Sequence, residues 1–151
     1  KIDFDFETVK LKTKDNPVFY VQYAYARCKS LIETFNKTFD RKLNLVDLIN
    51  TNLVNLNNET EISLVIKLCN FFNIILSSAK FYEPHRLTNY LYELAKDLHV
   101  YWGLGKINVN NKIIIEKDFN LSLSRITLVF AVSLIIKKGM DILKINCPEN
   151  M

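Results

Sequence analysis

Apolar residues recur every three or four positions along most of the chain, and this period predicts long amphipathic helices. The clearest case spans residues 17–38, where Asn16 suits the N-cap and Pro17 suits the first turn. One face carries the predicted core residues Val21, Ala24, Cys28, Leu31, Ile32 and Phe35. A second face carries Tyr20, Tyr23, Arg27, Ser30 and Thr34.

The second face of this helix has two interpretations. Tyrosines beside a core face usually pack with the ring and keep the hydroxyl in water. Alternatively, Tyr23 and Arg27 lie one turn apart and offer a flat ring and a planar cation to a binding partner.

Three further helices follow from the same period. Residues 58–81 begin with Asn58 and Glu61 at capping-box spacing. Pro84 can open the helix of residues 84–102, which carries Trp102 on its predicted core face, and the glycines at 103 and 105 are expected to close it. Residues 121–143 are apolar on nearly every side, so this helix is expected at the centre of a bundle.

The connecting segments are shorter and more polar. Residues 42–57 are predicted to form a short helix and then an asparagine-rich loop. Residues 106–119 are predicted to form a loop, or a small hairpin with an Asn-Asn turn. Residues 1–15 alternate apolar and charged side chains, as in an extended arm or a short strand.

The fold class predicted from this pattern is all-α. The residues expected to be buried together are Val65, Cys69, Phe72, Leu91, Leu94, Leu98, Val129, Phe130 and Leu134. The stripe predicted to face inward on the helix of residues 58–81 is Ile62, Val65, Cys69, Phe72, Leu76 and Ala79.

Composition fits one soluble helical domain. The chain has 151 residues, 49% of them hydrophobic, and its three glycines and three prolines are few enough to favour long helices. The net charge of +4 permits an anionic partner without requiring one. The three cysteines are far apart, which fits a reducing compartment, and the apolar run of residues 128–136 is too short to span a bilayer.

Catalytic chemistry is hard to find in the sequence. The two histidines, His85 and His99, are fourteen residues apart and are interpreted as separate boundary residues. No glycine-rich loop could hold a phosphate, and no nucleophile with its base is marked by spacing. The sequence therefore indicates a binding or structural module more than an enzyme.

Three segments resemble arginyl-tRNA synthetases, in the order of that family. Residues 15–27, Asp-Asn-Pro-Val-Phe-Tyr-Val-Gln-Tyr-Ala-Tyr-Ala-Arg, resemble the junction between the catalytic and anticodon-binding domains. Residues 83–95 resemble a helix of the anticodon-binding domain, and residues 147–151, Cys-Pro-Glu-Asn-Met, resemble the family's ending. Two details depart from the family pattern: its Asp-Ala-Leu-Arg run reads Glu-Pro-His-Arg here, and Asn150 stands where Arg or Lys is usual.

The resemblance implies a helical bundle of the class I synthetase anticodon-binding type over residues 16–151. Residues 1–15 would then be the remnant of the junction with the catalytic domain. The family's pocket for the middle anticodon base corresponds to Tyr23, Arg27 and Met151, with Asn16, Pro17 and Tyr20 beside it. RNA loops are read in this way, by unstacked bases on aromatic or guanidinium planes.

The resemblance also implies the partners and the missing parts. We expect arginine tRNAs and the protein's own catalytic domain as partners, a monomer in the cytoplasm, and no membrane contact. ATP and Mg²⁺ would belong to the parent ligase, since its His-Ile-Gly-His and Lys-Met-Ser-Lys-Ser signatures have no match here and no cofactor is expected in this chain. Lys1 in place of a start methionine suggests a fragment or a processed product. A helical protein–protein interaction module, or the related domain of another synthetase such as the glycyl enzyme's β subunit, remain the alternatives.

Overall fold

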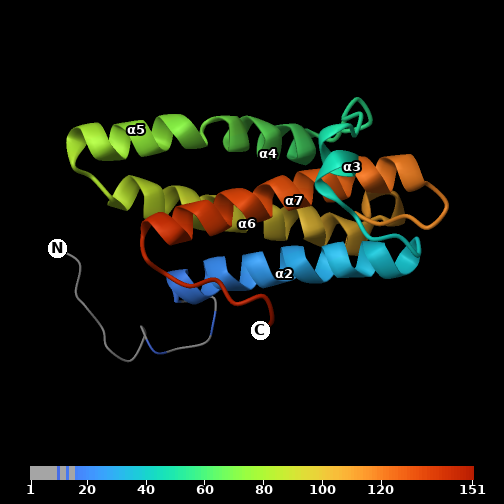
Figure 1. Cartoon of the computed structure of the whole chain (residues 1–151), viewed down its shortest axis with the longest axis horizontal. Helices are drawn as coiled ribbons and strands as arrows, with labels where there is room; N and C mark the ends of the chain where they lie inside the picture. The colour runs from blue at the N-terminus through green and yellow to red at the C-terminus, as the bar shows by residue number, and fades with distance from the viewer. Residues whose placement is uncertain (1–9, 11–12, 14–15) are drawn as a thin grey trace.

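The fold is an elongated bundle of long helices (Figure 1). The computed structural model describes Lys10, Thr13 and residues 16–151, so most of the predicted N-terminal arm lies outside the described residues. Within the described part there are six α-helices, one short 3₁₀ helix and no strand, which confirms the all-α prediction. The helices are α2 (Pro17–Thr38), α3 (Leu45–Ile49), α4 (Glu59–Cys69), α5 (Phe71–Phe81), α6 (His85–Ile107) and α7 (Phe119–Ile142), with the 3₁₀ helix η1 at Val109–Asn111.

The start of α2 follows the sequence signals. The side-chain oxygen of Asn16 accepts hydrogen bonds from the backbone N–H groups of Val18 and Phe19, at 3.1 and 3.4 Å. These bonds satisfy donors that the first turn of a helix otherwise leaves free. The predicted core face of α2 is confirmed for Val21, Ala24, Cys28 and Phe35, all of which are buried.

Helix α7 lies at the centre and packs against α2, α4 and α6 (Figure 1). Its buried residues include Ile126, Val129, Val132 and Ile136, each with no exposed surface. Gly139 allows a close helix crossing, because a Cβ there would lie 2.6 Å from Cδ2 of Leu91. The predicted central helix is therefore confirmed, and its glycine serves packing.

By length and hydropathy alone, α7 could cross a membrane, with a mean hydropathy of 1.9 in its most apolar window. Half of that window is buried inside the bundle, as in the core helix of a packed domain. Arg125, on the same helix, is buried and hydrogen-bonded to other helices and loops. The hydropathy of α7 is thus accounted for by its position in the core.

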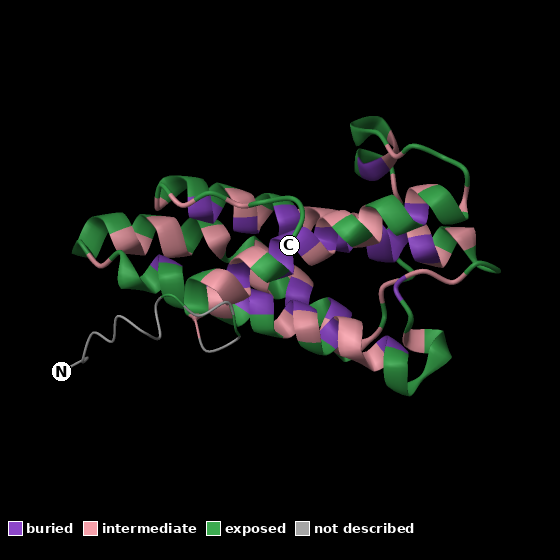
Figure 2. Ribbon diagram, turned by 90° about the horizontal axis from the view of Figure 1, so that it is seen from below, coloured by how far each residue is buried: buried purple, intermediate pink, exposed green. Residues whose placement is uncertain are grey.

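The prediction of one helix over residues 58–81 is wrong in two respects. The helix breaks at Asn70, where α4 and α5 meet at an angle of about 40°. The inward side carries Glu61, Leu64, Leu68, Phe71 and Ile74, which lie one or two positions before members of the predicted stripe. Exposed instead are Ile62, Ile66, Cys69, Phe72 and Leu76. Figure 2 shows how buried and exposed positions alternate along the helices of the bundle. A polar side chain, Glu61, occupies the innermost position, so hydrophobicity alone pointed to the wrong side.

The prediction of the core is correct for the residues of α6 and for one residue of α7. Leu91, Leu94, Leu98 and Val129 are buried as predicted, whereas Val65 and Phe130 are half-buried. Leu134, which was predicted to be buried, is 46% exposed.

Helix α6 continues past the two glycines that were expected to end it. Gly105 lies inside the helix, where a Cβ would come within 3.0 Å of Cα of Lys112. The segment after α6 therefore crosses directly over this glycine, and the hairpin interpretation of residues 106–119 is wrong.

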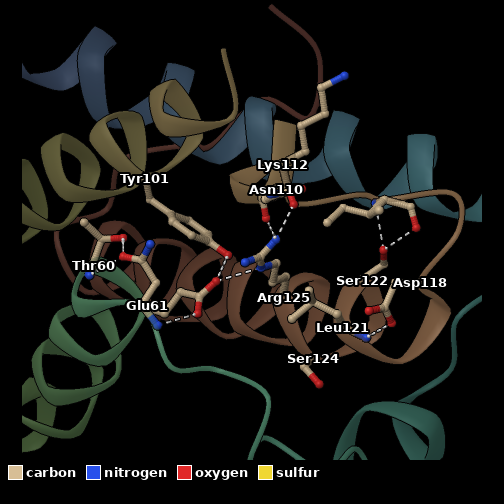
Figure 3. A network of polar contacts seen from close by, with 12 residues as sticks. Thr60, Glu61, Tyr101, Asn110, Lys112, Asp118, Leu121, Ser122, Ser124 and Arg125 are labelled. Atoms are coloured by element: carbon tan, nitrogen blue, oxygen red, sulfur yellow. Dashed lines mark hydrogen bonds and ion pairs between the residues drawn. The ribbon is translucent and has the colours of Figure 1, made fainter. Parts of the chain in front are cut away.

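A buried polar network joins this segment to the bundle (Figure 3). Arg125 Nε donates to Glu61 Oε1 at 2.7 Å, and Tyr101 Oη donates to the same oxygen at 2.9 Å. Arg125 Nη1 also donates to the backbone carbonyls of Asn110 and Lys112, at 2.8 and 2.7 Å. Burial is the main cause that raises the pKa of Tyr101, so its hydroxyl keeps the proton that it donates. The network thereby fixes α4, α6, α7 and the segment after α6 to one another.

Candidate nucleic-acid interface

The aromatic and basic side chains of α2 meet those of α6 on one side of the bundle. The guanidinium carbon of Arg27 lies 3.7 Å from the ring centroid of Trp102 and 4.7 Å from that of Tyr23. Arg27 also donates a hydrogen bond from Nη2 to Tyr23 Oη. Lys106 Nζ lies 4.1 Å from the centroid of Trp102, so this ring contacts two cations. Such contacts hold the guanidinium plane in a defined orientation.

The C-terminal tail folds back along α2 (Figure 1). Gln22 Nε2 donates to the backbone carbonyl of Asn146 at 2.7 Å, and Lys29 Nζ forms an ion pair with Glu149 Oε1 at 3.1 Å. These two contacts bring Met151, which is half exposed, to the side of Tyr23 and Arg27.

Two hollows flank these side chains. The first, here called the His99 hollow, measures about 660 Å³ and is lined by Thr13, Phe19, Tyr20, Tyr23, Arg27, His99, Trp102, Gly103, Lys106 and Met151. The second, here called the tail hollow, measures about 450 Å³ and is lined by Tyr23, Ala26, Arg27, Ser30, Leu31, Thr34, Trp102, Glu149, Asn150 and Met151. Each offers flat rings, a cation and hydrogen-bonding groups, which suits a planar polar ligand.

A larger hollow of about 790 Å³ lies along α4 and α5. Its basic residue, Lys67, is already paired with Asp97, and its aromatic residue, Tyr90, donates its hydroxyl to the backbone carbonyl of Lys67 at 2.9 Å. The groups that could bind an anion or a base are therefore better placed between α2 and α6.

Of the six residues predicted for the site, the structure brings four together. Tyr20, Tyr23, Arg27 and Met151 line the His99 hollow. Asn16 caps α2, and Pro17 lines a separate small hollow toward the end of α7. These two residues hold the start of the helix and do not border either of the two hollows.

Sequence reasoning missed His99 and Trp102. The sequence pattern predicts a lone boundary position for the histidine and a core position for the tryptophan. Both face α2: the ring centroid of His99 is 4.8 Å from that of Tyr20 and 5.5 Å from that of Tyr23. Their spacing of three residues shows that they share one face of α6, but it does not show that this face meets α2.

Burial controls the charge of these groups. Loss of water around His99, and then the positive charge of Arg27, lower the pKa of His99 to about 4. The imidazole is therefore neutral at pH 7. Burial is also the largest cause that raises the pKa of Tyr20, so that phenol stays protonated. In the described part of the chain, no group of three or more His, Cys, Asp or Glu side chains could hold a metal ion.

Comparisons with known proteins agree on one family. The model of the DALR anticodon binding domain matches residues 21–151. The arginine–tRNA ligase of Agrobacterium fabrum is 39% identical over 150 residues, and that of Brucella ovis is 43% identical over 154 residues. Each match covers 99% of this chain and 26% of the relative, so the chain spans about a quarter of the length of these curated relatives.

A solved structure supports the same fold. A structure described as an arginyl-tRNA synthetase from Campylobacter jejuni superposes with a TM-score of 0.78 at 20% sequence identity. The match covers 98% of this chain and 29% of that chain, which establishes the likeness of the bundle. From the matched residues 21–151, the chain belongs to the DALR anticodon-binding domain family.

Proposed function

We propose that this domain binds the anticodon stem and loop of arginine tRNAs. The observation that carries the proposal is the arrangement of Tyr23, Arg27 and Trp102, in which a guanidinium lies against two rings at the border of two hollows. Unpaired RNA bases bind to such surfaces by stacking on the rings and by hydrogen bonds to their edges. The family and its relatives support tRNA as the source of the loop.

Within this proposal, the middle anticodon base binds beside Tyr23, Arg27 and Met151. All arginine codons have G at the middle position, so the base to be read is cytosine. Met151 is suited to the contact because its thioether is flexible and packs favourably against rings. Asn16 and Pro17 act indirectly, by fixing the start of the helix that carries Tyr20 and Tyr23.

The wider role follows from the length of the relatives. We propose that residues 16–151 are the anticodon-binding part of a monomeric, cytoplasmic arginine–tRNA ligase. Its catalytic domain would adjoin this one and supply the binding of ATP and Mg²⁺. On this view the chain alone neither activates arginine nor charges tRNA, and arginine-dependent ATP–pyrophosphate exchange by the pure chain would contradict that.

The decisive experiment is titration of the chain with arginine tRNA, with a non-cognate tRNA, and with an arginine tRNA altered only at the middle anticodon base. Preference for the unaltered arginine tRNA is expected. The logarithm of the affinity should fall linearly with the logarithm of the salt concentration, because phosphate contacts release counterions. A protein–protein interaction module would instead bind the three tRNAs equally, and only with the weak, salt-sensitive affinity that it would show for any RNA.

A further inference from the structure

His99 is held by α6 against the tyrosines of α2 and is part of the wall of the His99 hollow. Of the two histidines in the chain, the other, His85, is exposed at the start of α6. The two imidazoles therefore form a natural pair for comparison, one at the hollow and one remote from it.

The tautomer of His99 is assigned from the surroundings of its two ring nitrogens. The backbone of Tyr20 partly opposes the lowering of the pKa of His99, as a carbonyl oxygen does when it lies near an imidazole N–H. The Nε2 atom is buried and has no hydrogen-bond partner, so we assign the contact with Tyr20, and the ring proton, to Nδ1. Since the ring is neutral at pH 7, Nε2 carries a lone pair and acts only as an acceptor.

A second buried atom without a partner belongs to the same hollow. Among the residues that the structure describes, only His99 Nε2 and Arg27 Nε are buried side-chain polar atoms with no hydrogen-bond partner. Both side chains lie against Tyr23. Buried polar atoms are nearly always paired in folded proteins. One unpaired acceptor and one unpaired donor beside the same ring thus point to a ligand that presents the complementary groups.

We propose that His99 is a specificity-determining residue that accepts a hydrogen bond from the amino group of the base bound in the His99 hollow. This inference rests on the proposed function. The ligand is an unpaired RNA base whose edge carries an amino group next to an acceptor nitrogen. Cytosine has this edge, with its N4 amine beside N3, and Arg27 Nε–H is the donor for the acceptor nitrogen or the adjoining carbonyl. Uracil carries a carbonyl at C4, which would oppose the lone pair of Nε2, and a proton at N3, which would oppose Arg27.

The test uses anticodon stem-loop RNAs that differ only in C or U at the middle position. The variants are His99→Phe, which keeps a ring between Tyr20 and Tyr23, and His99→Gln, which keeps an acceptor. The matched control is His85→Phe. Dissociation constants for both RNAs give a ratio of C to U preference for each protein, and thermal unfolding shows whether each variant folds.

The wild-type chain and His85→Phe should prefer the C loop to the same extent. His99→Phe should lower the preference about 3- to 10-fold, the size expected for one neutral hydrogen bond. His99→Gln should retain more of the preference than His99→Phe. An unchanged preference in His99→Phe, or an equal loss of affinity for both loops, would show that the histidine only packs.

A second measurement needs no change at position 99. In ¹⁵N-histidine-labelled His85→Phe protein, His99 is the only histidine, since the chain has two. Its Nε2 signal should move upfield when the C loop binds, as an acceptor nitrogen does on gaining a hydrogen bond, and should not move so with the U loop. The same shift with both loops would overturn the inference. A wild-type chain that binds both loops equally would overturn the proposed function as well, so the two failures are distinguishable.

Discussion

Arg125 and Glu61 form an ion pair inside the bundle, with their side chains 5% and 0% exposed and an Nε–Oε1 distance of 2.7 Å. Each of the two charged groups also has further polar partners. The other carboxylate oxygen, Oε2, accepts the backbone N–H of Asn58 at 3.1 Å, and the guanidinium also binds two carbonyl groups. The charge of Glu61 is thus held at the start of α4, where a helix favours an anion.

Removal of one member of this pair should destabilise the domain strongly. Arg125→Met leaves a buried carboxylate without its cation, for which the expected loss in free energy of unfolding is ~3–5 kcal/mol. Chemical denaturation measures this loss. Hydrogen exchange at residues 110–113 should also become faster, because the carbonyls of Asn110 and Lys112 lose their donor. The double variant Glu61→Leu/Arg125→Met should recover much of the loss, and a double variant less stable than Arg125→Met would contradict the charge argument.

The packing of α4 and α6 gives a second prediction. Leu94 has no exposed surface, and Leu94→Ala should lower the free energy of unfolding by ~2–5 kcal/mol through the cavity it leaves. Leu64→Ala should have an effect in the same range, since Leu64 is equally buried. Ile66→Ala is the matched control on the same helix, 65% exposed, and a surface change of this kind should stay within ~0.5 kcal/mol. A larger effect at Ile66 than at Leu64 would mean that α4 is turned the other way.

The same residues show why the sequence predicted the fold better than its details. The helical period placed α2, α7 and the start and core face of α6 correctly, because their inward faces are apolar and long. It failed on α4 because the innermost side chain is a glutamate whose cation, Arg125, lies 64 positions along the chain. A partner so distant in sequence leaves no local pattern.

For the candidate site, the resemblance supplied Tyr23, Arg27 and Met151, and the helix period showed that the first two are neighbours. The position of His99 depended on which side of α6 faces α2, and Trp102 was assigned to the core on its apolar character. Its contact with Arg27 is a tertiary feature that no spacing within α6 reveals.

The pH dependence of stability gives a third prediction. His99 in the folded protein has a pKa of about 4, below the ordinary value of 6.5 that applies to the unfolded chain. The unfolded state therefore binds a proton first as the pH falls. The contribution of the neutral imidazole is complete above pH 6.5 and is lost progressively as the pH falls from 6.5 toward 4.

Thermal unfolding between pH 7 and pH 4 measures this effect. The midpoint of wild-type protein should fall more steeply over this window than that of His99→Phe, in which no proton is taken up at this position. His85→Phe should follow the wild type. Parallel curves for His99→Phe and the wild type would mean that the imidazole titrates normally in the folded state.

The last prediction concerns the base-binding surface. Tyr23 is 36% exposed and borders both hollows, so its ring is available to a base that leaves the RNA stack. Stacking of a base on an aromatic side chain contributes ~1–3 kcal/mol. Tyr23→Ala should therefore weaken binding of arginine tRNA about 5- to 150-fold, at ~1.4 kcal/mol per tenfold. Tyr82→Ala is the matched control, because Tyr82 is 91% exposed at the end of α5 and lines neither hollow.

Arg27→Ala should act differently from Tyr23→Ala. The guanidinium supplies directed donors as well as charge, so its loss should lower both the affinity and the preference for cytosine at the middle position. The Tyr23–Trp102 surface would also lose the group that lies against both rings. An arginine tRNA already altered at the middle base should bind both variants about as well as it binds the wild type. If the two substitutions weaken the cognate and the altered tRNA equally, Tyr23 and Arg27 contribute only general affinity, and the middle base is read elsewhere.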